Sequence, residues 1–412
     1  MRSPKTKWII LFLWVLPGLL PAGKPDWGFF GHRQINKLAV FTLPPELGQF
    51  YKSHIDFITE HAVDPDKRRY ATKHEAVRHY IDIDHWGEQP FDHLPRDRDA
   101  VVLKYGRFVA VDVDGDSLFF SRTDTSFFPP GKDHHLLDKR NYRWQPELLP
   151  AYRRHLKDQY YDDQAVVRGA ALEEFFLDAP FGKMDHLIFI DDFSPYGILP
   201  YHLEAYYYQL VSAFQKKNRD RILRISTEMG HYLGDASVPL HTTENYNGQM
   251  TNQIGIHAFW ESRIPELFAD RSFEPIIGKA RYLVNPRKFF WDLVLESNKL
   301  VEDVLRIEKE LSVQFASDRQ YCYTERLGRT IRTQCEEYAL AYKEQLNGMV
   351  EDRWRRSVMA IGSVWYSAWL DAGSPDLSEG QWTLSEEESE LREKLNNLFQ
   401  SGAPKGRRHD NF

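Results

Sequence analysis

The segment MGHYLGDASVPLHTTENYNG, residues 229–248, carries the pattern on which the interpretation of the chain depends. His231 and Asp235 are four residues apart, so on a helix both side chains lie on one face and can reach a single cation. Pro239 then ends the helix, which lets His241 turn back toward the same point. The positions between them are mostly apolar. A row of polar groups in such surroundings leaves buried charge uncompensated unless a cation lies among them.

A second pair with the same spacing follows closely, formed by His257 and Glu261 in HAFWE. One such pair is weak evidence, because 16 His and 60 acidic residues in 412 positions produce about two pairs by chance. For any single histidine, an ordinary hydrogen-bonded role remains the better interpretation. The whole set, five potential ligands within residues 231–261, indicates a metal site.

The composition limits the function. Of 412 residues, 42% are hydrophobic and 27% charged, as in folded soluble proteins. The formal net charge of -7 excludes a broadly basic nucleic-acid-binding surface. Two cysteines, Cys322 and Cys335, exclude a cysteine-rich zinc site, so metal ligands must come from His, Asp and Glu. Whether these two form a disulfide stays open at this point.

The N-terminus has the order of a secretory signal peptide, predicted over residues 1–23. Arg2, Lys5 and Lys7 precede an apolar run, residues 8–20, that ends in Pro-Ala-Gly. The run is too short to span a bilayer comfortably, so we expect a secreted or periplasmic protein without a stable membrane span; an uncleaved anchor is the alternative. Removal of this segment shifts the formal charge from -7 to about -10.

Helical periodicity predicts an all-α fold, with one multi-helix domain over residues 24–373. Apolar residues share a helix face from Gly31 to Tyr80, with a break at Pro44-Pro45. Long helices are expected to resume at Pro200 and to run to about Ala372.

Two parts of the chain depart from this helical pattern. Residues 86–200 are predicted to be an inserted region of mixed structure, because they are rich in Pro, Gly, Asp and aromatic residues. Within it, alternating valines before Asp114-Gly115 predict a β-hairpin. Residues 374–412 are charged and are predicted to form a flexible tail with a short helix near 384–399.

Four segments resemble the zinc-dependent phospholipase C and S1/P1 nuclease superfamily and occur in the same order: WGFFGH (27–32), RHYIDID (78–84), GHYLGDASVPLH (230–241) and IHAFWESRIPE (256–266). The resemblance covers about half of the chain and leaves residues 86–200 and the tail without a counterpart. It implies an all-α domain built around three zinc ions that hydrolyse phosphate esters.

The resemblance also implies a set of ligands. One zinc would be held by Asp64, His79, His231 and Asp235, a second by His241, His257 and Glu261, and a third by His32, the shared Asp235 and the free amine and carbonyl of Trp27. Asp64 keeps the family interval to His79, although Asp66 lies two residues further on. Signal cleavage after Ala22 or Gly23 would leave residues ahead of Trp27, so a second trimming step would be needed to free its amine.

Zinc lowers the pKa of bound water to about 7, so the resemblance implies a zinc-bound hydroxide as the nucleophile. Asp235, as the bridging carboxylate, and Asp64 are the implied catalytic residues. Asp82 matches a carboxylate that orients an arginine in the nucleases, but the expected arginine position here is Lys67, next to Arg68.

Features of the sequence point to both branches of the superfamily and therefore to two substrate classes. Glu261 and the compact loop from His241 to His257 resemble the phospholipases, whereas the short interval from Trp27 to His32 resembles the nucleases. Tyr80, the expected substrate-binding residue, suits either a stacked base or a choline-type cation, and a core packing role is at least as good an interpretation. We expect a phospholipase C-like phosphodiesterase. A single-strand nuclease and a non-catalytic metal-containing binding protein are the alternatives.

Overall fold

The computed structural model describes residues 29–115, 117–120, 148–162, 164–175, 184–326, 329–378 and 384–407. It is mostly helical, with 65% helix and 8% strand, together with a smaller antiparallel β region. The expected mainly helical class is therefore confirmed at that level. The predicted signal peptide and Trp27 lie outside the described residues.

The helical body is formed by two groups of helices, one before and one after the inserted region in the sequence. The first group consists of α1 (Phe29–Ala39), α2 (Pro45–Ser53), α3 (Ile55–Glu60), α4 (Asp64–Arg68) and α5 (Lys73–Ala76). The second consists of α8 (Leu199–Gln215), α9 (Arg219–Ser237), α10 (Ile256–Ala258), α11 (Ile264–Ser272), α12 (Pro286–Asn298), α13 (Val301–Gln314), α14 (Ser317–Gln320), α15 (Glu336–Gln345), α16 (Met349–Asp371) and α17 (Glu386–Ser401). None of the described helices combines the length and apolar character needed to cross a membrane.

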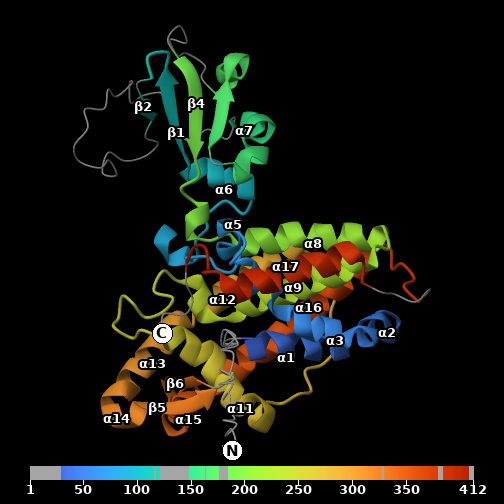
Figure 1. Ribbon diagram of the computed structural model, residues 1–412, viewed down its shortest axis with the longest axis vertical. Coiled ribbons are helices and arrows are strands. Elements are labelled where there is room, and N and C mark those ends of the chain that lie inside the picture. Colours follow the sequence, from blue (N-terminus) through green and yellow to red (C-terminus); the bar gives the residue numbers. More distant parts are fainter. Residues whose placement is uncertain are drawn as a thin grey trace, which may run out of the picture.

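Helix α9 is the centre of the body, where it runs beside α8 and α16 (Figure 1). It begins after Asn218, whose side chain accepts a hydrogen bond from the backbone N–H of Arg221 at 3.0 Å. It ends at Ser237, because Pro239 lacks an N–H and Val238 is already extended. All its residues from Ile225 to Ser237 are buried, including His231 and Asp235. The helix therefore carries polar side chains into the core.

Two glycines of α9 let α1 approach it closely. A Cβ added to Gly230 would lie 1.9 Å from Oδ1 of Asn36, and one added to Gly234 would lie 3.0 Å from Nδ1 of His32. Asn36 is fully buried and donates to the backbone oxygen of His32 at 2.9 Å. The absence of side chains at these two positions thus brings His32 against the face of α9 that carries His231.

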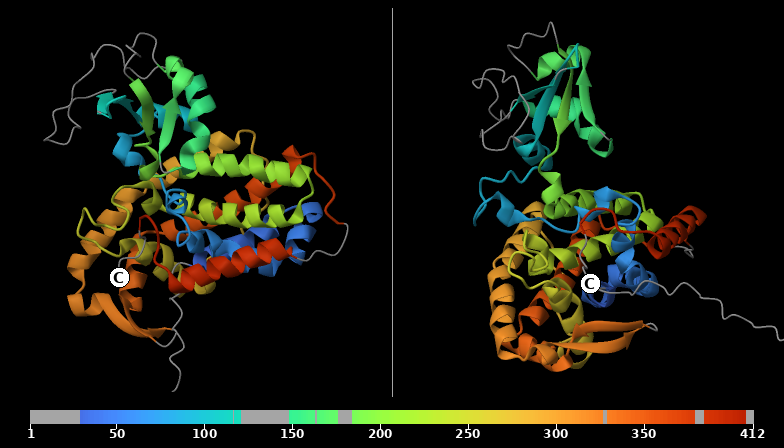
Figure 2. Two further views of the ribbon diagram at one scale, coloured as in Figure 1. Left: turned by 45° about the horizontal axis from the view of Figure 1, so that its top comes forward. Right: turned by 60° about the vertical axis from the view of Figure 1, so that its left-hand side comes forward.

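The inserted region contains a four-stranded antiparallel sheet with strand order β2-β1-β4-β3, formed by β1 (Arg107–Asp112), β2 (Ser117–Phe120), β3 (Ala165–Arg168) and β4 (Met184–Ile190). The inserted region also contains the helices α6 (Arg98–Tyr105) and α7 (Leu149–His155). The expected hairpin at Asp114-Gly115 is β1–β2. The sheet projects from the helical body, as Figures 1 and 2 show from different sides.

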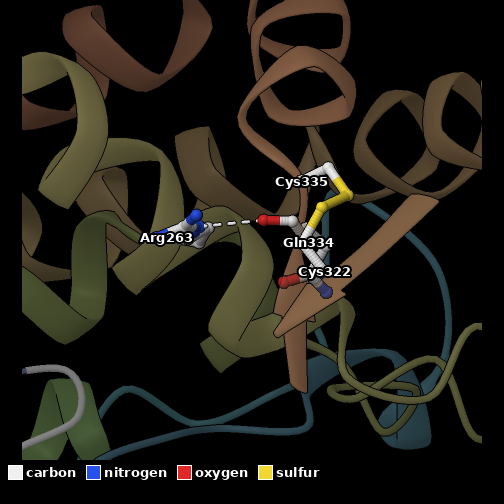
Figure 3. The surroundings of a disulfide bond; sticks show 4 residues. All are labelled: Arg263, Cys322, Gln334 and Cys335. Carbon is white, nitrogen blue, oxygen red and sulfur yellow. Dashed lines mark hydrogen bonds between the residues drawn. A yellow bond between two sulfur atoms is a disulfide. The ribbon is translucent and has the colours of Figure 1, made fainter. Parts of the chain in front are cut away.

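A second hairpin interrupts the stretch that was expected to be helical to Ala372. Strands β5 (Tyr321–Arg326) and β6 (Arg329–Gln334) pair antiparallel. A disulfide joins Cys322 in β5 to Cys335, which follows β6 (Figure 3). The guanidinium of Arg263 donates from Nε to the backbone oxygen of Gln334 at 3.1 Å, which ties the hairpin to the segment that precedes α11. The sequence left open whether Cys322 and Cys335 are paired, and the structure shows that they form a disulfide across this hairpin.

The charged C-terminal stretch packs on the body through α17. The predicted short helix near 384–399 is present, but it does not extend into solvent as a flexible tail would. Leu395 and Phe399 are buried, and the Phe399 ring lies 5.1 Å from that of Tyr70. Arg392 of this helix forms an ion pair with Asp64 of α4. Apolar and ionic contacts that the local sequence does not reveal therefore fix this segment.

We expect Gly230→Ala to destabilise the fold by about 1–3 kcal/mol, because its Cβ would collide with buried Asn36. Gly31→Ala in α1 is the matched control, because its Cβ would meet its nearest neighbour at 3.8 Å and alanine favours helix. Chemical denaturation of both variants measures the difference. An equal free energy of unfolding for the two would contradict the required close approach of α1 and α9.

Candidate metal centre

The candidate ligands come from several elements that meet at α9. His231 and Asp235 lie one turn apart on α9, as their spacing predicted, and His231 Nε2 is 3.5 Å from Asp235 Oδ2. His241 lies on the short turn Pro239–Thr242 that follows this helix. His257 in α10 and Glu261 in the π-helical turn Phe259–Arg263 are also one turn apart, with 2.8 Å between Nε2 and Oε2. Both predicted helical pairs are therefore formed.

The first group of ligand atoms surrounds His231. His79 Nδ1 is 3.1 Å from His231 Nε2 and 3.0 Å from Asp235 Oδ2. Asp66 Oδ1 is 3.8 Å from both of these imidazole nitrogens. Ligand atoms of Asp66, His79 and His231 thus lie within 4.8 Å of one another, and the Asp235 carboxylate contacts both histidines of this group.

The second group consists of His241, His257 and Glu261. Nε2 of His241 is 3.2 Å from Nε2 of His257 and 3.3 Å from Oε2 of Glu261. The third group joins the other two. Its member His32 stacks on His231, with 3.8 Å between the ring centroids. The Nε2 atom of His32 lies 3.4 Å from Asp235 Oδ1 and 3.4 Å from Glu261 Oε1. The three groups among the described residues therefore form one connected centre.

The separations within these groups suit metal coordination. Ligand atoms about 2.0–2.1 Å from one tetrahedral ion lie about 3.3–3.4 Å apart. Across the three groups, the separations given above range from 2.8 Å for His257 and Glu261 to 3.8 Å for His231 and Asp66, so together they bracket this value. Two of the contacts bring imidazole nitrogens together, His79 with His231 and His241 with His257. Lone pairs that face each other repel unless a proton or a metal ion lies between them, so the donor set fits bound metal.

Two backbone carbonyls hold imidazoles in the orientation that metal binding requires. His231 Nδ1 is 2.8 Å from the oxygen of Ala62, and His257 Nδ1 is 3.1 Å from that of Tyr246. When Nδ1 carries the proton and donates it to a carbonyl, Nε2 of a neutral ring keeps its lone pair for a metal. Both rings therefore present Nε2 to the other ligands.

The charges of the buried groups favour a cation. Burial alone lowers the pKa of His32, but Glu261 and Asp235 raise it overall to about 9. Burial, together with the charge on His32, lowers the pKa of His231 to about 4. For Asp235 and Glu261, burial alone raises the carboxyl pKa, yet neighbouring histidines, with His241 acting on both, lower it overall. Anionic carboxylates therefore face imidazoles of which His231 is neutral, an arrangement that a divalent ion would stabilise.

The structure corrects the assignment of Asp64 as a metal ligand and catalytic residue. Its carboxylate accepts hydrogen bonds from His61 at 3.0 Å, Lys67 at 3.3 Å and Arg392. Asp66 faces the histidines instead. Two residues on a helix differ by about 200° in direction, so the sequence interval to His79 could not decide which carboxylate faces the centre. The ion pair with Arg392 fixes Asp64 elsewhere.

Tyr80 is buried, and a guanidinium from the C-terminal segment covers its ring. The Cζ of Arg407 lies 4.1 Å from the ring centroid of Tyr80 and 3.4 Å from that of Tyr246. Its Nη1 donates to both carboxylate oxygens of Asp82, at 2.6 and 2.8 Å. The arginine that pairs with Asp82 is therefore Arg407, far in the sequence from the position at Lys67 that the resemblance implied. The only signal in the sequence is the short basic run at residues 405–408.

The residues first considered for this arginine are engaged elsewhere. Lys67 donates to Asp64 at 3.3 Å. Arg68 donates to Glu75 at 2.8 Å and to Glu228 at 2.9 Å. Neither side chain is therefore paired with Asp82.

No family model matches the chain, and no curated protein matches it either. The assignment of this centre therefore depends on its own geometry and chemistry.

We expect Asp66→Asn to lower the metal content by about one ion per chain, because an amide oxygen is a weaker, uncharged ligand. Asp64→Asn is the matched control. It should keep its metal, because its carboxylate pairs with Arg392 and belongs to none of the groups of candidate ligands. Elemental analysis of both purified variants measures the number of metal ions per chain. Metal loss on Asp64→Asn, with none on Asp66→Asn, would restore the original assignment.

Proposed function

We propose that the chain is a secreted zinc-dependent hydrolase of phosphate esters, with the activity of a phospholipase C-like phosphodiesterase. The observation that carries this proposal is the connected set of histidines and carboxylates in which Asp235 faces two groups of ligands. Multi-metal sites that share a carboxylate are suited to phosphate ester hydrolysis, because they bind the attacking and the leaving oxygen together. The resemblance to the zinc-dependent phospholipase C and S1/P1 nuclease superfamily agrees with this chemistry.

Each zinc would have a defined set of ligands in this proposal, with Asp235 shared by two of them. Asp66, His79, His231 and Asp235 would hold the first, His241, His257 and Glu261 the second, and His32 with Asp235 the third, to which Trp27 is a further candidate outside the described residues. Zinc is favoured over calcium and magnesium because imidazole suits zinc, whereas those ions prefer oxygen ligands throughout. When bound, zinc supplies Lewis-acid polarisation of phosphoryl oxygens and lowers the pKa of water.

The protein's own groups prepare this chemistry. The carbonyls of Ala62 and Tyr246 orient His231 and His257. Imidazole nitrogens approach both oxygens of the Asp235 carboxylate, His32 at 3.4 Å and His79 at 3.0 Å, which places the carboxylate between two groups of ligands. Burial of these side chains excludes bulk water, so their electrostatic interactions with a phosphate ester are strengthened.

A phospholipid is the favoured substrate class. After removal of the predicted signal peptide, the formal charge of about -10 opposes the approach of a polymeric nucleic acid. Tyr80 has one ring face covered by Arg407, which disfavours its use as a base-stacking platform. The disulfide between Cys322 and Cys335 is consistent with export to an oxidising compartment.

We expect the purified protein to release a phosphorylated head group from phosphatidylcholine, and to lose this activity in a chelator. Denatured DNA incubated with the same sample should remain intact. Product analysis by phosphorus NMR and gel electrophoresis distinguishes the cases. Cleavage of DNA without release of a head group would favour the single-strand nuclease. Metal binding without cleavage of either substrate would favour the non-catalytic binding protein.

We expect Asp235→Asn to be the most damaging single change to a ligand. Because its carboxylate faces two groups, the variant should lose more than one metal ion, and activity should fall by more than about 100-fold. His257→Ala is the comparison, because His257 belongs to a single group and should release about one ion. Metal analysis and steady-state kinetics measure both. Equal metal losses from the two variants would contradict the shared role of Asp235.

A further inference from the structure

A large cavity lies between the inserted sheet and the helical body. Its volume is about 1040 Å³, at the top of the range of about 300–1,000 Å³ for pockets that bind small molecules. One wall belongs to the sheet and α7, the opposite wall to α5 and the loop that follows it, and the end of the described chain, Gly406 and Arg407, closes part of it. Three segments far apart in the sequence therefore enclose one space.

The sheet side of the cavity is mainly aliphatic. Val109 of β1 and Ile188 of β4 are directly opposite each other in the strand register and so lie on the same face of the sheet. Ile190 is two residues beyond Ile188, on that same face, whereas Ala165 of β3 pairs with Phe189 and these two line the cavity from the other face of the sheet. An aliphatic wall of this kind favours an alkyl chain over a planar polar group.

Aromatic side chains of the cavity are already engaged by other groups. The Tyr196 ring is stacked on His85 at 3.6 Å between centroids, and Arg98 lies over the ring of Tyr160. Tyr80 donates from its hydroxyl to the backbone oxygen of Pro195 at 3.0 Å and carries Arg407 on its ring. These rings therefore act as walls and are poor platforms for a stacked base.

Two lining residues, Tyr80 and Arg407, connect the cavity to the metal centre, although no candidate ligand lines the cavity itself. Tyr80 lines the cavity and directly follows His79 in the chain, so a single peptide bond joins the wall to a ligand. Arg407 also lines it and packs on Tyr246, whose carbonyl oxygen accepts from His257. The Nε of Arg407 is buried and has no hydrogen-bond partner among the described residues. The apolar space thus has a polar end, formed by the Arg407–Asp82 ion pair, at which one guanidinium nitrogen keeps a free N–H.

We propose that this cavity binds the alkyl chain of an amphiphilic phosphodiester, whose phosphate then lies toward Arg407 and the metal centre. This inference builds on the proposed function, because it names the part of the substrate that the inserted region recognises. It gives the inserted region a role in specificity, since one wall of the site exists only because of β1, β3 and β4.

Binding of monomeric alkyl phosphocholines to the full-length, metal-loaded protein tests the proposal without requiring turnover. Each methylene buried in the cavity should tighten binding about three- to fourfold, so the affinity should rise steeply from butyl to decyl chains. Ile188→Trp and Ala165→Trp, which fill the space from β4 and β3, should abolish this dependence on chain length. Val113→Trp is the control, because Val113 is 66% exposed beyond the end of β1 and outside the cavity.

Circular dichroism and metal content should be the same for all four proteins, which separates a blocked cavity from a misfolded sheet. Affinity that does not depend on chain length, or dependence that survives both cavity variants, would overturn the proposal. Tighter binding of a mononucleotide that the cavity variants weaken would overturn it as well. Hydrolysis of a chromogenic aryl phosphodiester measures the proposed function separately. Its absence would refute the activity and leave the binding result standing.

Discussion

The carboxylate of Asp235 is the interaction on which the rest of the structure depends. It is buried in the last turn of α9, and imidazoles approach its two oxygens: His32 on one side, His79 and His231 on the other. Burying a carboxylate without partners would destabilise the fold by several kcal/mol. Each segment that carries one of these histidines must therefore place it close to Asp235. The packing of α1, the loop after α5 and the turn after α9 is thereby determined around one side chain.

This constraint explains why the core is built with small residues where α1 meets α9. Gly230 and Gly234 allow the two helices to approach until His32 stacks on His231 at 3.8 Å. Larger side chains would stabilise an isolated helix better, because glycine is among the weakest helix formers. The chain thus gives up local helix stability in favour of a geometry in which ligands from two helices reach the same point.

Local spacing made part of this centre predictable. The pairs His231/Asp235 and His257/Glu261 follow from the helical period, and the break at Pro239 places His241. Asp66 could not be chosen over Asp64, because the choice depends on Arg392, more than 300 residues away. Similarly, the hairpin at Asp114-Gly115 has a local turn signal, whereas the pairing of β3 and β4 with it depends on long-range contacts that periodicity does not encode.

The two parts of the chain that the family resemblance left without a counterpart meet at the same face of the molecule. The inserted sheet forms one wall of the large cavity, and Arg407, at the end of the segment anchored by α17, closes its side nearest the metal centre. Arg407 is held by Asp82, whose two oxygens both accept from Nη1, and by two aromatic rings, and these contacts offset the conformational entropy lost when this segment is ordered. In the proposed function the candidate ligands would supply general phosphate ester chemistry, so selectivity would come from the surrounding walls. The inserted region and the C-terminal segment form those walls, and a substrate preference should therefore be sought there.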